Sequence, residues 1–297
     1  MKYMVNVFDE NSKIFRTLWI DHGRVRYSEL PNERSGIYEV ATTNFELYPG
    51  KVTIDENAVS AFIEGNGDSY IKRLLLYGYT SFVQMISLNY ESELTKKLKR
   101  SRDALKTCPI DYVHAVKIPL NKLSESLARK VKMENIPIIF FQADSVDEII
   151  STHWNSITGS MFPRKTLLVC VPSSNVKSSQ KKKQMLEQWR TIVGKKRINS
   201  YFGFPSEGEE IKELLAKRIG LFPKKGSLVN GSDADYVMYQ TGIRRVRNIN
   251  FPDIIVLKGN VVKWGTKWDL EQSKGQELTT LIPGKFIPIE DINRYDE

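Results

Sequence analysis

The pattern of apolar and polar positions divides the chain into three stretches. Up to about residue 47, short runs of alternating character are separated by turns rich in Pro, Asn and Gly, which is typical of antiparallel strands. Residues from about 229 to the end return to this pattern. Strands are expected over residues 15–20, 24–27, 37–40, 45–48, 234–239, 254–257 and 260–264.

The middle stretch alternates continuous apolar runs with helical periodicity. Strands are expected over 52–54, 81–87, 111–119, 136–143 and 166–171, with a weaker one over 201–204. Helices are expected over 68–76, 91–106, 121–135, 147–154, 179–193 and 209–221. Apolar strands spaced by helices predict a parallel sheet that is covered on both faces.

The length of this middle stretch limits the architecture. It has about 170 residues, whereas a complete (β/α)₈ barrel takes about 250. We therefore predict an α/β fold with a trimmed or incomplete (β/α) TIM-type barrel, flanked by a small β-sandwich built from both chain ends. The expected domains are a composite sandwich of residues 1–48 and 222–297 and an incomplete barrel of residues 49–221.

Charge and cysteine content narrow the classes of function. The 297 residues carry a net charge of +9, and the basic residues gather in runs at 96–102, 181–183, 195–197 and 244–247. Apolar residues at helical spacing lie beneath the first three runs, which is typical of surface helices with a solvated face. No apolar run approaches the roughly 18 residues of a membrane span, and residues 1–13 lack the apolar core of a signal peptide. We expect a cytoplasmic protein without a membrane partner, in which Cys108 and Cys170 are buried and reduced.

Several short motifs follow one another in a recognisable order. Residues 49–57 read PGKVTIDEN, and residues 218–239 read RIGLFPKKGSLVNGSDADYVMY. Further motifs are WIDHGRV at 19–25, LLYGYTS at 75–81 and LKGNVV at 257–262. In this order they resemble the amidohydrolase superfamily of dihydropyrimidinase- and dihydroorotase-like metal-dependent hydrolases. The resemblance implies a barrel with a split sandwich, and it implies a homodimer.

The metal-binding residues of that family do not carry over. The resemblance places its first two histidine ligands at Asp55 and Asn57, and a middle-strand acidic ligand at Gln142. No histidine follows His153, although the family has ligand histidines on later strands. A carboxylate beside a neutral amide suits only weak binding of hard cations. We therefore assign no metal ligand and no cofactor.

His114 and a pair of aspartates have two readings each. His114 lies within an expected strand and either forms a metal-free acid–base couple with Asp55 or is a buried, hydrogen-bonded histidine. Asp233 and Asp235 form a carboxylate pair in the GSDAD motif, where we expect them to cap turns through nearby backbone amides.

Three functions remain open from the sequence. The leading hypothesis is a non-catalytic amidohydrolase-like protein, a pseudoenzyme that acts by binding an unknown protein partner or small ligand or by assembly, with a pocket around Asp55, Asn57, His114 and Gln142 left from the family. The second is a hydrolase of amide C–N bonds with a rearranged site at Asp55, His114 and Gln142, which alone would call for a divalent metal. The third is binding of a polyanion or nucleic acid through the basic helices, although no nucleic-acid motif accompanies them.

Overall fold

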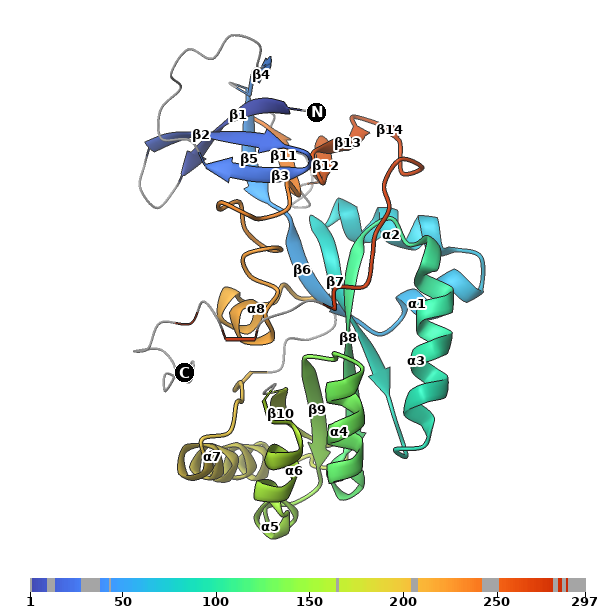
Figure 1. Cartoon of the computed structure of the whole chain (residues 1–297), viewed down its shortest axis with the longest axis vertical. Coiled ribbons are helices and arrows are strands. Elements are labelled where there is room, and N and C mark those ends of the chain that lie inside the picture. The colour runs from blue at the N-terminus through green and yellow to red at the C-terminus, as the bar shows by residue number, and fades with distance from the viewer. Residues whose placement is uncertain are drawn as a thin grey trace.

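A computed structural model describes residues 2–9, 14–27, 38–42, 44–163, 166–203, 208–241, 251–279, 283–284 and 287. The fold is α/β, with one curled parallel sheet and two separate, largely antiparallel sheets (Figure 1). The basic run at 244–247 and residues 37 and 204 of the expected strands lie outside the described residues.

The parallel sheet forms a half-barrel of five strands in the order β10-β9-β8-β7-β6. Its strands are β6 (Lys51–Asp55), β7 (Tyr79–Ser87), β8 (Asp111–Pro119), β9 (Ile138–Ala143) and β10 (Leu167–Pro172). All five match strands expected from continuous apolar runs. The weaker sixth strand does not form over residues 201–203, and a single bridge between Ser200 and Leu168 stands in its place.

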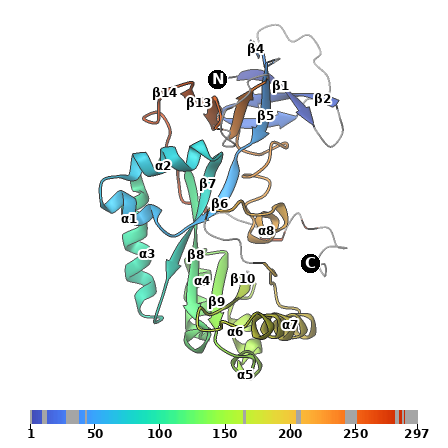
Figure 2. The same cartoon turned by 180° about the vertical axis from the view of Figure 1, so that it is seen from behind.

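In the part of the chain that the structure describes, seven helices cover the outer face of the half-barrel (Figures 1 and 2). They are α1 (Ala58–Ile63), α2 (Gly67–Leu76), α3 (Glu93–Ala104), α4 (Glu125–Met133), α5 (Val146–Ser151), α6 (Trp154–Ser160) and α7 (Ser179–Lys196). The short 3₁₀ turns Leu105–Thr107 and Leu120–Lys122 replace two predicted helix ends. Helix α4 begins later than expected because the Ser124 hydroxyl accepts from the Leu127 amide and caps it.

Helix α8 (Glu213–Ile219) covers the inner face of the half-barrel, on the side opposite α1 and α3 (Figures 1 and 2). The chain that leads to α8 also covers the exposed edge of β6. There the Ile211 amide donates to the Val52 carbonyl at 2.9 Å, and Thr53 forms a bridge with Glu210. At the other edge, the Leu168 amide of β10 donates to the Asn199 carbonyl at 3.0 Å. Both edges of the open sheet are thus covered by the chain itself, which limits pairing with other strands.

The two remaining sheets are built from both ends of the chain. One has the order β3-β2-β1-β4, from β1 (Lys2–Asp9), β2 (Ile14–Asp21), β3 (Arg24–Tyr27) and β4 (Tyr38–Val40). The other has the order β14-β13-β12-β11-β5, from β5 (Phe45–Pro49), β11 (Tyr236–Gln240), β12 (Ile254–Leu257), β13 (Asn260–Trp264) and β14 (Lys267–Trp268). The pairing of β5 with β11 joins the two chain ends. Strands β1 and β14 were not expected from the sequence.

The segment 273–278 extends the half-barrel beside β8. Strand β9 pairs with β8 only over Val116–Pro119. On that side, the backbone of the first half of β8 is therefore available to pair with another segment. The Tyr112 amide donates to the Gln276 carbonyl at 3.1 Å, and the Leu278 amide donates to the Tyr112 carbonyl at 2.8 Å. A Cβ on Gly275 would lie 2.1 Å from the Ile110 carbonyl oxygen, so only glycine fits this close approach.

Candidate functional site

The inner face of the half-barrel is apolar up to the carboxyl ends of its strands. Every strand contributes alternate side chains to it: Val52, Ile54, Val83, Met85, Val113, Ala115, Ile138, Phe140, Leu167 and Val169. Leu215, Ala216 and Ile219 of α8 pack against this layer, and all three are buried. The space that a barrel encloses is therefore filled here by a helix.

Asp55 lies at the end of β6 and holds the start of α1 in place. Its Oδ1 accepts from the amides of Asn57 at 2.9 Å and Ala58 at 2.6 Å, and its Oδ2 accepts from the Tyr70 hydroxyl at 2.5 Å. Burial and the Asp55 carboxylate raise the pKa of Tyr70, so its hydroxyl stays protonated and donates. Both oxygens of Asp55 thus have partners within the fold.

Asn57 and Gln142 lie in different settings: Asn57 adjoins Asp55 through its backbone amide, whereas Gln142 lies on a distant strand. Asn57 is exposed at the N-terminus of α1. Gln142 is half-buried near the carboxyl end of β9, between Pro119 of β8 and Val171 of β10. Because side chains alternate along a strand, Gln142 shares the inner face with Phe140, whereas Asp55 points to the outer face with its partner Tyr70.

His114 belongs to a buried polar network on the outer face. Its Nε2 lies 2.9 Å from the Ser101 hydroxyl of α3, and its Nδ1 lies 3.0 Å from Oε1 of Glu277. Arg102 binds the same carboxylate with two nitrogens, at 2.8 and 2.9 Å, and reaches Glu134 at 2.6 Å. Burial raises the pKa of Glu277, but His114 and Arg102 outweigh it and lower this pKa to about 2.

This network ties the segment 273–278 to the half-barrel. Glu277 provides the link, because its neighbours Gln276 and Leu278 pair with the backbone of Tyr112. The structure also places Gln84 of β7 between Asp55 and His114 in the sheet register. The carboxylate that holds the imidazole of His114 is therefore that of Glu277, and Asp55 bonds to Tyr70 instead.

A set of polar residues lines the carboxyl end of the half-barrel, where barrel enzymes carry their active sites. Lys117 of β8 shares the inner face with Val113 and Ala115, and its ammonium lies 3.1 Å from Glu56. Gln142 is the last residue of β9 on this inner face. Beyond β9, the Ser173 hydroxyl donates to Asp144 at 2.5 Å. In the part of the chain that the structure describes, no group of three or more His, Cys, Asp or Glu side chains is arranged to hold a metal ion.

A buried ion cluster lies at the opposite end of the sheet, at the start of β8. The Lys225 ammonium lies 2.6 Å from Asp111, 2.8 Å from Asp233 and 2.6 Å from Asp235. Lys258 adds a second cation 2.7 Å from Asp111. Burial alone would lower the pKa of Lys225, but the carboxylates of Asp235, Asp111 and Asp233 raise it. Lys225 is therefore charged at neutral pH.

The expectation that Asp233 and Asp235 cap turns needs correction. Both carboxylates bind Lys225, and the backbone amide that Asp235 accepts belongs to Lys258, on a different hairpin. Asp235 is buried, and its two oxygens accept from the Lys225 ammonium at 2.6 Å and from the Lys258 amide at 2.7 Å. The pair joins the segment before β11 to β8 and the β12–β13 hairpin.

The sequence motifs meet at the same junction. The Ala234 amide donates to the Gly23 carbonyl at 2.8 Å, and the Gly259 amide donates to the Ala234 carbonyl at 2.9 Å. The Gly50 amide donates to the Asp235 carbonyl at 2.9 Å. A Cβ on Gly50 would lie 2.1 Å from Oγ1 of Thr80, which explains the glycine before β6. Motifs far apart in the sequence thus form one packed unit.

Comparisons with known proteins show the fold. No protein-family model and no curated protein matches the chain. Solved structures do: a dihydropyrimidinase from Brevibacillus agri has a TM-score of 0.60 and 11% identity, covering 94% of this chain and 98% of that one. A D-hydantoinase has a TM-score of 0.57 and 13% identity, over 94% and 99%. A β-aspartyl dipeptidase from Fervidobacterium islandicum has a TM-score of 0.55 and 11% identity, over 91% and 98%.

The chain shares the fold of these three neighbours. This is the fold that the sequence motifs resemble. At 11–13% identity the likeness concerns the fold alone. None of the helices in the described ranges is long and apolar enough to cross a membrane.

Two groups that shape these sites gave no clear signal in the sequence. Glu277 lies 163 positions from His114, in a segment without periodicity, so nothing local pointed to the pair. Lys225 lies within the motif at 218–239, only ten positions before Asp235. Two adjacent lysines and two aspartates within this turn-rich segment were the available sign of an ion cluster.

Proposed function

We propose that this chain is a non-catalytic protein with an amidohydrolase fold, which acts by binding. One observation carries the proposal: α8 fills the inner face of the half-barrel with Leu215, Ala216 and Ile219. A catalytic centre needs a concave space at the carboxyl ends of the strands for substrate and for an activated water. The helix and the apolar layer beneath it fill the inside of the half-barrel, and the polar side chains that remain partly exposed lie at the carboxyl end.

The contacts of two candidate pocket residues, Asp55 and His114, support the same view. Asp55 holds the start of α1 and the Tyr70 hydroxyl, and His114 joins Ser101 to Glu277. Both side chains stabilise the fold and both point to the outer, helix-covered face. We infer that they have structural roles.

The second candidate function is hydrolysis of an amide C–N bond at the carboxyl end of the half-barrel. The observation that favours it is the pair of Glu56 and Lys117, which lies at that end and is partly exposed. In such a site Glu56 would take the proton from an attacking water, and Lys117 would stabilise the developing oxyanion. Gln142 would orient the substrate from the neighbouring strand.

Hydrolysis assays separate the two functions. The purified chain is incubated with Zn²⁺, Mn²⁺ or Co²⁺ and offered a dihydropyrimidine, a hydantoin and a β-aspartyl dipeptide. We expect rates equal to those of the metal-containing buffer. Turnover that Glu56→Gln or Lys117→Met abolishes would overturn the proposal and establish the hydrolase. Glu64→Gln is the matched control, because Glu64 is exposed at the end of α1, away from Lys117.

A further inference from the structure

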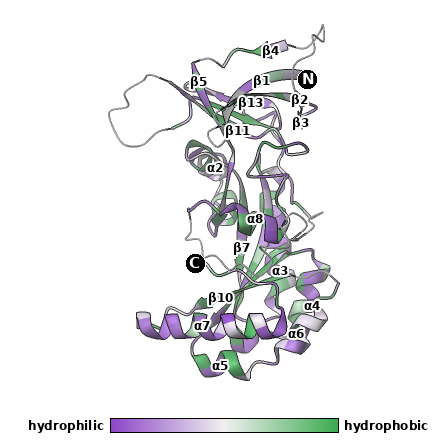
Figure 3. Cartoon of the chain, turned by 90° about the vertical axis from the view of Figure 1, so that its left-hand side faces the viewer, coloured by the Kyte–Doolittle hydropathy of each residue, from purple (hydrophilic) through white to green (hydrophobic). Residues whose placement is uncertain are grey.

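Helix α7 carries a strong positive charge. Residues 179–197 contain seven Lys or Arg residues and one acidic residue, Glu187. The helix buries Met185, Trp189, Ile192 and Val193 against the outer core, so its basic residues face outward. Figure 3 shows it as a largely hydrophilic helix at one end of the molecule.

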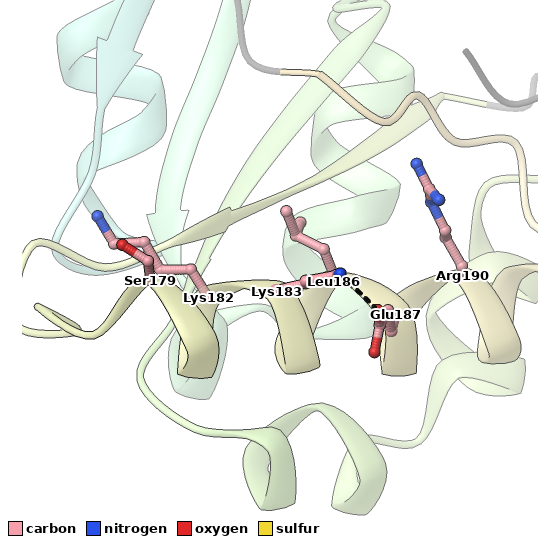
Figure 4. A pocket seen from close by; sticks show the side chains of 6 residues that line it. All are labelled: Ser179, Lys182, Lys183, Leu186, Glu187 and Arg190. Carbon is pink, nitrogen blue, oxygen red and sulfur yellow. Dashed lines mark ion pairs between the residues drawn. The ribbon is translucent and has the colours of Figure 1, made fainter. Parts of the chain in front are cut away.

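A hollow of about 390 Å³ lies along one flank of α7 (Figure 4). Its described lining follows helical spacing, so these side chains share one side of the helix: Ser179, Lys182, Lys183, Leu186, Glu187 and Arg190. Binding sites for small molecules have volumes of roughly 300–1,000 Å³. The volume of the hollow lies within this range, and because its described lining comes from α7 alone it is an open groove.

The charges in the hollow favour an extended anion. Lys182 and Arg190 lie at opposite ends, eight residues or about 12 Å apart along the helix axis. Lys183 contacts Glu187 only at 4.0 Å, and because both side chains are largely exposed this pair contributes little. The lining carries three cations and one carboxylate, which leaves a net positive site.

Two features give the hollow a defined shape. The Arg190 guanidinium lies 5.2 Å from the centre of the Phe202 ring, and this contact restricts its position. Half-buried Leu186 forms an apolar surface between the two charged ends. The hollow also starts at the first residue of α7, where the helix dipole adds positive potential.

We propose that this hollow binds a small molecule that carries a chain of phosphates, such as a nucleoside polyphosphate. The guanidinium of Arg190 suits bidentate binding of a phosphate, and Lys182 provides a point charge for another. Single-stranded nucleic acid binds on rows of aromatic rings, and the described lining residues include no aromatic ring. The inference gives the proposed binding role a ligand class, at a site away from the inner face of the half-barrel.

Calorimetric titration of the full chain with tripolyphosphate, at low and at physiological salt, tests the inference. The double variant Lys182→Ala/Arg190→Ala should bind at least tenfold more weakly than the wild type. The control Lys181→Ala/Lys195→Ala removes the same charge from exposed positions of α7 outside the hollow, and it should bind like the wild type. Unchanged melting temperatures confirm that the variants fold.

Three results would overturn the inference. The first is the absence of tripolyphosphate binding by the wild type at millimolar concentration. The second is an equal loss of affinity in both double variants, which would reduce the effect to net charge. The third is a thymidine oligonucleotide that binds more tightly than tripolyphosphate and loses affinity in the hollow variant, which would assign the surface to nucleic acid. None of these results depends on hydrolysis, so the proposed function is tested separately.

Discussion

Replacing Lys225 with methionine removes the ammonium that lies among the carboxylates of Asp111, Asp233 and Asp235. The Lys225 side chain is 1% exposed and that of Asp111 is 0% exposed, so water cannot take over the role of the lost cation. Methionine fills much of the same volume, and the expected effect therefore comes from the uncompensated negative charges.

Removing one partner of a buried ion pair costs about 3–5 kcal/mol. Since domains unfold with a free energy of about 5–15 kcal/mol, this is a large part of the total. If the free energy of unfolding falls by about 3 kcal/mol per molar urea, the midpoint of urea unfolding should fall by about 1 M or more. Circular dichroism and tryptophan fluorescence follow the transition. Lys224→Met is the control, because Lys224 precedes Lys225 and is only half-buried.

The pH dependence gives this prediction a second readout. Burial raises the pKa of Asp111, but Lys225 and Lys258 outweigh it and hold this pKa below the usual value. A carboxylate with a lowered pKa stabilises the fold above its unfolded pKa, near 3.8, and this contribution is lost as the pH falls through the folded pKa. The difference between wild type and Lys225→Met should therefore shrink below about pH 4. A destabilisation below about 1 kcal/mol at pH 7, or one equal to that of Lys224→Met, would refute the assigned role of the cluster.

Three further predictions concern other contacts. Glu277→Gln should lower stability at pH 7 by at most about 3 kcal/mol, because the pKa of Glu277 lies at about 2 in the fold. In thermal melts the wild type should lose this stability between pH 5 and 2, and the variant should show a flatter profile. Parallel profiles of the two proteins would contradict the contact of Glu277 with His114 and Arg102. Gly275→Ala should lower the free energy of unfolding by more than about 2 kcal/mol, because the new Cβ would meet the backbone of Ile110. Gly194→Ala lies inside α7 with no atom within 4 Å of the new Cβ, so in the same urea experiment it should raise this free energy by about 0.5–1 kcal/mol. Tyr70→Phe should cost about 1–3 kcal/mol, because Asp55 keeps a buried oxygen without its donor; an unchanged unfolding midpoint would contradict this role of Asp55.

The sequence predicted the half-barrel well because its strands are continuous apolar runs. Such runs are typical of parallel strands buried on both faces, and all five formed where they were expected. The weak sixth strand was wrong over residues 201–203, since one bridge at Ser200 covers the edge of β10. Helices α1 and α6, of six and seven residues, were not expected from the sequence.

The contacts of the candidate site were less predictable, because they join residues far apart in the sequence. His114 was correctly singled out as a strand histidine, and its carboxylate partner is Glu277 in a segment without a pattern. Asp55 matched a motif position, yet its partner Tyr70 lies on a helix whose sequence shows only periodicity. The role of Lys225 follows from three carboxylates that converge from two parts of the chain. Periodicity predicts elements, but it does not predict which polar side chains meet between them.

The filled inner face of the half-barrel is the centre of this account, and the metal content of the purified chain tests it most directly. Protein is expressed in medium supplemented with zinc, iron and manganese, purified without chelators, and measured by inductively coupled plasma mass spectrometry. We predict less than about 0.1 equivalent of any transition metal per chain, since catalytic sites of this kind hold metal at full stoichiometry. One equivalent or more of zinc, iron or manganese would contradict the account.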